Sequence, residues 1–308
     1  MTLLVMHPVC LAHEMGPDHP ERPDRLRAIE RAFESEAFQM LARDIAPRAD
    51  DMAIARAHPL DYIEALRGAA PAQGYTVIDQ DMSMSPATFE AALRSAGAAL
   101  FAVDEVMTGR ANNAFVATRP PGHHAETRMP MGFCFFNNTA VAARHAQAVH
   151  GAERIAIVDF DVHHGNGTQH IFWNEPDVMY ASTHEMPLFP WTGELSERGE
   201  HDQIVNAPLR AGDAGEVFRE AMGEAILPRL ADFAPDLLIV SAGFDAHRRD
   251  PLANLNLVED DFVWITRKLM DVAQKRCDGR IVSLLEGGYD LQSLARSVSA
   301  HVAMLMEG

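Results

Sequence analysis

The segment IVDFDVHHGNGT, residues 157–168, joins an apolar run to four ionisable side chains within six positions. Asp159, Asp161 and His163 recur at every second position, so they share one face if the segment stays extended. His164 has the opposite parity and is expected to point elsewhere. Burying such groups is costly unless they are paired or bind a metal. The spacing therefore predicts a polar or metal-binding site at the end of a strand.

Three other apolar runs end in residues of the same kinds. NAFVATRPPGHHAE brings His123 and His124, LLIVSAGFDAH brings Asp245, and RIVSLLEGGYD brings Tyr289 after two glycines. Each run alone is ordinary. In an open α/β sheet, however, the carboxyl ends of the strands form the ligand-binding edge. We therefore expect carboxylates, imidazoles and a phenol to converge there.

This set of groups suits the metal-assisted hydrolysis of an amide. Two aspartates and a histidine form a three-ligand site that leaves a coordination position open, as in catalytic zinc sites. A metal there polarises a carbonyl and activates water. Paired histidines supply a general base and acid, and a tyrosine hydroxyl stabilises a developing oxyanion. The residue types therefore predict a metal-dependent amidohydrolase.

The scaffold follows from alternating strand and helix patterns. Expected strands cover residues 2–6, 113–118, 154–160, 178–183, 237–243 and 280–285. Among the helices, Pro86 is expected at the first position of a helix over 87–107, Asp213 and Glu216 form a capping box before 217–230, and Gly279 follows a helix over 259–277. This alternation predicts the α/β class, as a single domain over residues 1–308 with a mostly parallel, doubly wound sheet flanked by helices.

The composition indicates which classes of partner and which cellular compartment to expect. The formal net charge of −18 argues against sequence-independent binding to nucleic acid, which needs surfaces rich in Lys and Arg, and it suits cationic substrates. Three widely spaced cysteines, Cys10, Cys134 and Cys277, predict no disulfide framework and a reducing, cytoplasmic compartment. No apolar run approaches the about 18 residues of a membrane span, so no membrane partner is expected. Homo-oligomerisation is left open.

Six motifs together resemble one family. HPERPDRL, RPPGHHAE, GFCFFNN, DFDVHHGNGTQ, SAGFDAHRRDPLA and EGGY follow one another between residues 19 and 289. In combination they resemble the histone deacetylase superfamily, especially its class II members and the bacterial histone deacetylase-like amidohydrolases. The resemblance implies the arginase/deacetylase fold. It also implies a zinc-dependent amidohydrolase that removes acetyl or related acyl groups from the ε-amine of lysine, in a peptide, or from a similar small amine.

The resemblance also implies a role for each matching residue. It assigns one zinc ion to Asp161, His163 and Asp245, and it makes His124 the general base with His123 as its electrostatic partner. The other implied roles are these: Asp159 orients His123, Asn166 orients His124, Tyr289 stabilises the transition state, Gly132, Phe133, Phe189 and Leu252 line the acyl-lysine tunnel, Asp159 and Ser182 bind a structural potassium ion, and Arg25 lies on the route of acetate release.

Two positions depart from parts of the family. Asn166 stands where class I members carry aspartate, and Leu252 stands where polyamine-selective relatives place a glutamate. The alternatives left open are an acetylpolyamine or other small-amide deacetylase, an arginase-type ureohydrolase and a non-catalytic acyl-lysine binder. GFDAHRRD is one residue too long for the arginase motif D-A-H-x-D, and the complete set of ligands, histidines and tyrosine argues against an inert binder.

Overall fold

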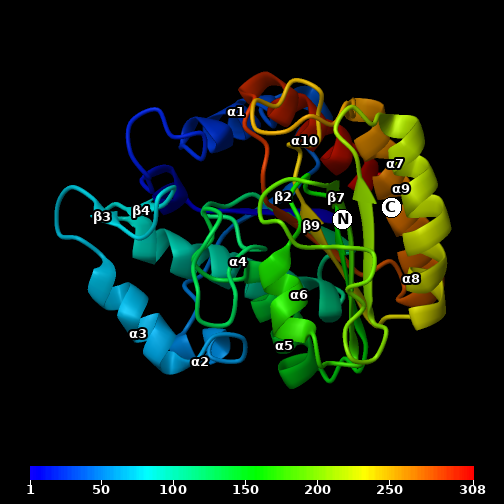
Figure 1. Cartoon of the computed structure of the whole chain (residues 1–308), viewed down its shortest axis with the longest axis horizontal. Coiled ribbons are helices and arrows are strands. Elements are labelled where there is room, and N and C mark those ends of the chain that lie inside the picture. Colours follow the sequence, from blue (N-terminus) through cyan, green and yellow to red (C-terminus); the bar gives the residue numbers. More distant parts are fainter.

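An eight-stranded sheet forms the centre of the computed structural model, which describes residues 1–308 (Figure 1). The strand order is β2-β1-β5-β10-β9-β6-β7-β8, and every neighbouring pair is parallel. The strands are β1 Thr2–Met6, β2 Ala42–Ile45, β5 Asn113–Val116, β6 Ile155–Asp159, β7 Val178–Glu185, β8 Ile204–Leu209, β9 Leu237–Ala242 and β10 Ile281–Leu285. The predicted α/β class with a parallel sheet is confirmed.

All six strands expected from apolar runs are present, and the two strands of this sheet that were not expected, β2 and β8, form its edges. Three of the four β2 residues, Arg43, Asp44 and Ile45, are exposed. β8 contains Pro208 and is only partly buried. Edge strands tolerate proline and charged residues because one side lacks a hydrogen-bonded neighbour. They therefore lack the continuous apolar run that marks a central parallel strand.

Helices cover both faces of the sheet. Figure 1 shows α4, α5 and α6 on one side and α7, α8 and α9 on the other. In β6, Ile155 and Ile157 belong to one apolar core, whereas Ala156 and Val158 belong to the second. The helices are α1 Asp24–Ala32, α2 Asp51–Ile54, α3 Leu60–Ala69, α4 Thr88–Met107, α5 Asn138–His150, α6 Asn166–Phe172, α7 Gly215–Ala221, α8 Leu227–Phe233, α9 Glu259–Arg276 and α10 Leu291–Leu305.

Short elements complete the chain. They are two 3₁₀ turns at Pro8–Leu11 and Glu36–Phe38, a π-helical turn at Met222–Ile226, and a small antiparallel pair of β3 Thr76–Val77 and β4 Ser83–Met84. No helix combines the length and the apolar character that crossing a bilayer requires.

Two expected helix starts were wrong. α7 begins at Gly215, and Asp213 does not cap it, because its Oδ2 instead accepts the Arg210 N–H at 2.7 Å. α4 begins at Thr88, two residues after Pro86, and the Thr88 Oγ1 accepts the Ser85 N–H at 2.8 Å. A turn precedes each helix, closed by Arg210 and Asp213 before α7 and by Ser85 and Thr88 before α4.

The expected end of α9 was right. The N–H of Gly279 donates to the Ala273 carbonyl at 3.1 Å, just beyond the last helical residue, Arg276. The same carbonyl also accepts the Cys277 N–H at 2.8 Å, and the glycine lets the chain turn back over the end of the helix.

Candidate active site

Two carboxylates and one imidazole converge where two neighbouring strands end. Asp161 and His163 follow β6, and Asp245 follows β9, which pairs with β6. The His163 Nδ1 lies 3.1 Å from Asp161 Oδ1 and 3.1 Å from Asp245 Oδ2. All three side chains are buried, and their ligand atoms lie within 4.8 Å of one another. The three residues expected to bind a metal are thus brought together.

Backbone N–H groups hold the two carboxylates in place. Gly287 donates to Asp161 Oδ2 at 2.8 Å, and Val162 donates to Asp245 Oδ1 at 2.9 Å. A Cβ on Gly287 would collide with both carboxylates, and so only glycine allows the chain to approach this closely. The oxygen that each aspartate turns toward the cluster is therefore fixed before any ligand binds.

The charges of this cluster favour a cation. Burial alone lowers the pKa of His163, but hydrogen bonds to Asp161 and Asp245 raise it to about 10. Burial and the Asp161 charge raise the pKa of Asp245. Two buried carboxylates need a positive partner, since unpaired buried charge is costly. One nitrogen and two oxygen donors around one point are a donor set that zinc accepts.

The tandem histidines have different partners, as the sequence indicated. The His123 Nδ1 lies 3.0 Å from Asp159 Oδ2, and the His124 Nδ1 lies 2.8 Å from Asn166 Oδ1. Their ring centroids are 4.0 Å apart. The Asn166 amide donates to Glu126 Oε1 at 3.0 Å, which leaves its oxygen for His124. His124 therefore carries its proton on Nδ1, and its Nε2 is free to accept another.

The two partners separate the two histidines electrostatically. Burial lowers the pKa of His123, but the charges of Asp161 and Asp159 outweigh it and raise that pKa to about 10. Burial and the positive charges of His123 and His163 hold the pKa of His124 well below its usual range. At neutral pH one ring is thus cationic and the other neutral.

Tyr289 reaches the same cavity from the loop after β10. Burial raises the pKa of its phenol well above the usual range, so that the hydroxyl remains a donor. Its backbone N–H donates to Asp250 Oδ2 at 2.7 Å, and the other oxygen of Asp250 accepts the Leu252 N–H at 3.0 Å. Arg25 stacks on the phenol ring at 4.9 Å and donates to the Gly288 carbonyl at 2.6 Å. Asp250 and Arg25 together hold this loop.

A cavity of about 520 Å³ leads to the cluster. Its wall includes the four residues expected to form the tunnel: Gly132, Phe133, Phe189 and Leu252. The Phe133 ring lies 5.9 Å from Tyr289 and the Phe189 ring 5.1 Å from His124, both edge-on. A Cβ on Gly132 would collide with the His124 ring. The cavity thus joins an aromatic passage to the base and the phenol.

The residues expected to bind potassium lie side by side. Asp159 and Ser182 are register partners on β6 and β7. The Ser182 Oγ lies 2.8 Å from His184 Nδ1, whereas Asp159 Oδ1 accepts the Asp161 N–H at 3.1 Å. The two side chains are therefore neighbours with different hydrogen-bond partners.

Glu286 and Tyr180 are among the site residues that were not identified from the sequence. Glu286 is buried, and its Oε2 accepts the N–H groups of Gly122 at 2.7 Å and His123 at 3.1 Å. Burial raises the pKa of Glu286 to about 7. The Tyr180 hydroxyl donates to Asp159 Oδ2 at 3.1 Å. Glu286 stands in the EGGY motif, and Tyr180 lies two residues before Ser182 on the same strand, so both could have been singled out.

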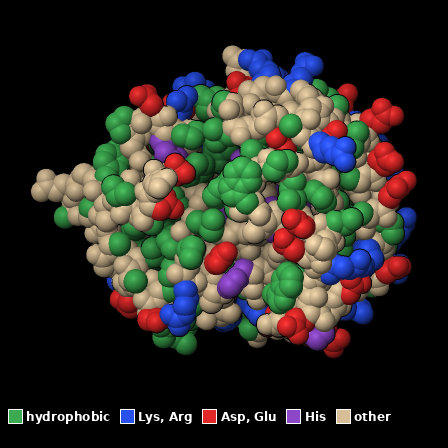
Figure 2. Space-filling view, in the orientation of Figure 1, with side chains coloured by type: hydrophobic (Ala, Val, Ile, Leu, Met, Phe, Trp, Pro, Cys, Tyr) green, Lys and Arg blue, Asp and Glu red, His purple; other side chains and the backbone are tan.

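The charged surface agrees with the acidic composition. Figure 2 shows Lys and Arg side chains in separated groups among acidic ones, without a broad basic area on that face. The net charge is −18. This face therefore lacks the continuous basic surface on which nucleic-acid binding depends.

Comparisons with known proteins agree with the fold and indicate the family. The histone deacetylase domain matches residues 19–305. The histone deacetylase-like amidohydrolase of Pseudomonas aeruginosa is 38% identical over 303 residues, which cover 91% of this chain and 80% of that protein. A probable deacetylase of Archaeoglobus fulgidus is 37% identical over 317 residues, which cover 100% of this chain and 87% of that protein.

A solved structure gives the same result. The crystal structure of the HDA15 HD domain superposes with a TM-score of 0.94 at 35% identity, covering 99% of this chain and 88% of that one. The relatives support a hydrolase with deacetylase activity on acylated amines, and the buried Asp161–His163–Asp245 group is a candidate for the metal that such enzymes typically need. The chain belongs to the histone deacetylase family.

Proposed function

We propose that residues 1–308 form one zinc-dependent deacetylase domain, which removes acetyl or related acyl groups from the ε-amine of lysine or from a similar amine. The observation that carries the proposal is the convergence of Asp161, His163 and Asp245 at the end of an aromatic passage. Zinc held there supplies Lewis-acid polarisation of the amide carbonyl and lowers the pKa of water.

Three residues around the cluster carry out proton transfer and stabilise the charge of the transition state. The His124 Nε2 takes the proton of the attacking water, because its Nδ1–H is held by Asn166. His123 is paired with the Asp159 carboxylate, which favours its imidazolium form, and it stabilises the negative charge of the tetrahedral intermediate. The Tyr289 hydroxyl donates a hydrogen bond to the same developing oxyanion. The leaving amine is protonated by the histidine pair.

The passage selects a linear acylated amine. Phe133 and Phe189 present ring surfaces to an aliphatic chain, and the Gly132 carbonyl is proposed to accept the substrate N–H. Arg25, whose guanidinium is buried beneath Tyr289, is proposed to guide the acetate product away from the site. Apolar rings thus face the aliphatic chain, a carbonyl faces the amide N–H, and a cation faces the acetate.

A second substrate class is favoured by the charge at the mouth. Asp79 and Asp81 line the outer part of the cavity. Carboxylates there attract cationic molecules, and the net charge of −18 adds to this attraction. Acetylated polyamines are therefore the second candidate, although Leu252 takes the place of the glutamate of polyamine-selective relatives.

We also propose a structural potassium ion beside Asp159 and Ser182, and a reducing, cytoplasmic environment. The first is supported by the burial of both side chains on adjacent strands, and the second by three cysteines that are all free and buried. Thermal stability in potassium should exceed stability in sodium at equal ionic strength. Equal midpoints in the two salts would contradict the ion.

A substrate panel tests the proposed function. The panel compares kcat/KM for acetyl-lysine peptides, acetylated polyamines, longer acyl-lysines, simple acetamides and arginine, with the zinc content per chain measured. Hydrolysis of the acylated amines is expected, with the polyamines separating the two substrate classes. Turnover of arginine alone would indicate a ureohydrolase, and an absence of turnover with the catalytic zinc bound would indicate a binding module.

A further inference from the structure

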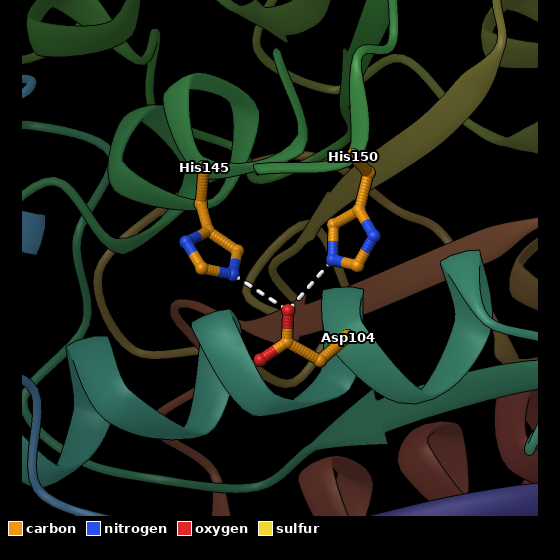
Figure 3. Close-up of side chains that lie close together, drawn as sticks. All are labelled: Asp104, His145 and His150. Carbon is orange, nitrogen blue, oxygen red and sulfur yellow. Dashed lines mark hydrogen bonds and ion pairs between the residues drawn. The ribbon is translucent and has the colours of Figure 1, made fainter. Parts of the chain in front are cut away.

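A second group of metal-ligating side chains lies at the far end of α5. α5 begins at Asn138, next to Asn137, whose side chain contacts the active-site loop at the Ala125 carbonyl, and it ends at His150. At 1.5 Å per residue this distance is roughly 20 Å along the helix. Asp104, His145 and His150 meet there, between α5 and the end of α4 (Figure 3).

Both imidazoles point at one carboxylate oxygen. Asp104 Oδ1 lies 2.7 Å from the Nε2 of His145 and 2.7 Å from the Nε2 of His150. The side chains are partly shielded, with 11% exposure for His145, 15% for His150 and 36% for Asp104. Three donor atoms from two helices therefore face one point that water or an ion can still reach.

These donors match a divalent transition-metal ion. Two imidazole nitrogens and one carboxylate oxygen form a set that zinc accepts, with one coordination position left open. The present 2.7 Å contacts are hydrogen-bond lengths. Donors held 2.0–2.1 Å from a tetrahedral ion lie roughly 3.3 Å apart. Each of the two Asp104–histidine contacts therefore has to lengthen by about 0.6 Å for an ion to replace the N–H···O bonds, and the three donor atoms already lie within 4.8 Å of one another.

Arg56 opposes this exchange. Its Nη1 lies 2.8 Å from the His145 Nδ1, and arginine can only donate, so the ring proton is kept on Nε2. An ion on Nε2 requires the proton on Nδ1, where it would face the Arg56 N–H. Arg56 lines a cavity of about 230 Å³ together with Asp50 and Asp104. The cavity gives the guanidinium room to turn away and offers Asp50 as a carboxylate partner.

We propose that Asp104, His145 and His150 bind a divalent transition-metal ion, zinc by the best match of donors, at a site separate from the catalytic centre, and that Arg56 competes with this ion for His145. The ion ties α4 to α5 and stabilises the folded chain according to its concentration. This site differs in position, donors and consequence from the proposed catalytic zinc.

The test measures a zinc equivalent beyond the catalytic one. Holoenzyme with its catalytic site loaded is titrated with zinc chloride by calorimetry, and its melting temperature is followed with and without added zinc. The wild type should bind one more ion than His150→Gln, or bind it at least about 10-fold more tightly, and zinc should raise the melting temperature of the wild type more than that of His150→Gln. His201→Gln, at an exposed histidine elsewhere, is the matched control and should behave as the wild type.

Arg56→Gln tests the competing donor. The amide oxygen of glutamine can accept the Nδ1–H that arginine repels, and a partner of a ligating histidine changes metal affinity about 10–100-fold. Zinc should therefore bind this variant about 10-fold more tightly. Turnover of the acetyl-lysine reporter should be equal in all these variants, which shows that they are folded and that the catalytic site is loaded.

Two results would overturn the proposal. Equal zinc stoichiometry and affinity in the wild type and His150→Gln would show that the cluster is a hydrogen-bonded link between the helices and not a metal site. An affinity that does not change in Arg56→Gln would remove the competing role of Arg56.

Discussion

Two clusters of the molecule are built from the same residue types but supported differently. At the ends of β6 and β9, Asp161 and Asp245 are buried and each accepts a backbone N–H, so their oxygens are fixed. Between α4 and α5, the side chain of Asp104 is held only by His145 and His150. Metal binding is stronger when the ligands are held in place in advance. We therefore expect a tightly bound ion in the first cluster and an exchangeable one in the second.

The balance of charge also favours a more tightly bound cation in the first cluster than in the second. The first cluster has two carboxylates for one imidazole, and it raises the pKa of His163 to about 10. The second has one carboxylate for two imidazoles, with Arg56 beside them. A surplus of negative charge attracts a cation, whereas a neighbouring guanidinium repels it. Geometry and charge thus rank the two clusters alike.

Asp161→Ala should have the largest effect. It removes a ligand and one of the two anions, so the chain should lose one zinc relative to the wild type and at least about 10³-fold in kcat/KM. Elemental analysis and reporter turnover are the measurements. Asp177→Ala, at an exposed aspartate, is the control. Zinc binding at the α4–α5 cluster should persist in Asp161→Ala, and an unchanged total zinc content would contradict the assignment.

Tyr289→Phe should lower kcat without removing metal. The phenol donates to charge that appears in the transition state, and loss of one such donor costs about 10²–10³ in kcat. KM should change little, because the ground-state carbonyl needs the donor less. Tyr75→Phe, at an exposed tyrosine, is the control for hydroxyl removal. A raised KM with kcat intact would make Tyr289 a binding residue.

The difference between the clusters also explains what could be read from the sequence. Asp159, Asp161 and His163 follow one another at period two after a central strand, so their convergence could be predicted. Asp104 and the two histidines of α5 are 41 and 46 residues apart, and only the packing of two helices brings them together. No regular spacing in the sequence predicts that these three residues lie together.

The limits for the fold have a similar cause. Central strands are buried on both faces and carry apolar runs, whereas β2 and β8 carry charged residues or proline at the edges. The EGGY motif could have indicated Glu286 as a site residue but not its partners, because the N–H groups of Gly122 and His123 belong to a distant loop. Side-chain contacts between residues that are far apart in the sequence cannot be predicted from the local pattern of residue types.

Gly287→Ala tests whether the catalytic cluster depends on the fixed positions of its two carboxylates. The added Cβ would collide with the Asp161 and Asp245 carboxylates, and we expect zinc affinity at the catalytic site to fall about 10–100-fold. Gly151→Ala, just beyond α5, meets no atom within 4 Å but has φ +67, so it should cost only about 1 kcal/mol of backbone strain. Competition with a zinc chelator and thermal melts measure both. Equal zinc affinity in Gly287→Ala and the wild type would show that the two carboxylates can move aside without weakening metal binding.

The smallest expected effect concerns the base and its neutral partner. His124 must be unprotonated in the free enzyme to accept the water's proton. Burial and the positive charges of His123 and His163 keep its pKa low, and Asn166 adds no negative charge. Asn166→Asp puts an anion against Nδ1, which favours the imidazolium form and raises the pKa of His124. Neutral His124 then requires higher pH, so the acidic limb of the kcat/KM profile should move upward by about 1 unit.

The carboxylate of Glu126 must be controlled in this experiment. It now accepts the Asn166 amide at 3.0 Å, and it would repel the new aspartate. The double variant Asn166→Asp, Glu126→Gln replaces that repulsion with an amide donor and should show the full upward shift, whereas Glu126→Gln alone should leave the limb near that of the wild type. Because the two imidazole rings lie 4.0 Å apart, the charge on one affects the protonation of the other, and the limb reports a value for the pair. With zinc content verified, a limb that stays in place or moves to lower pH in the double variant would show that Asn166 does not tune the base.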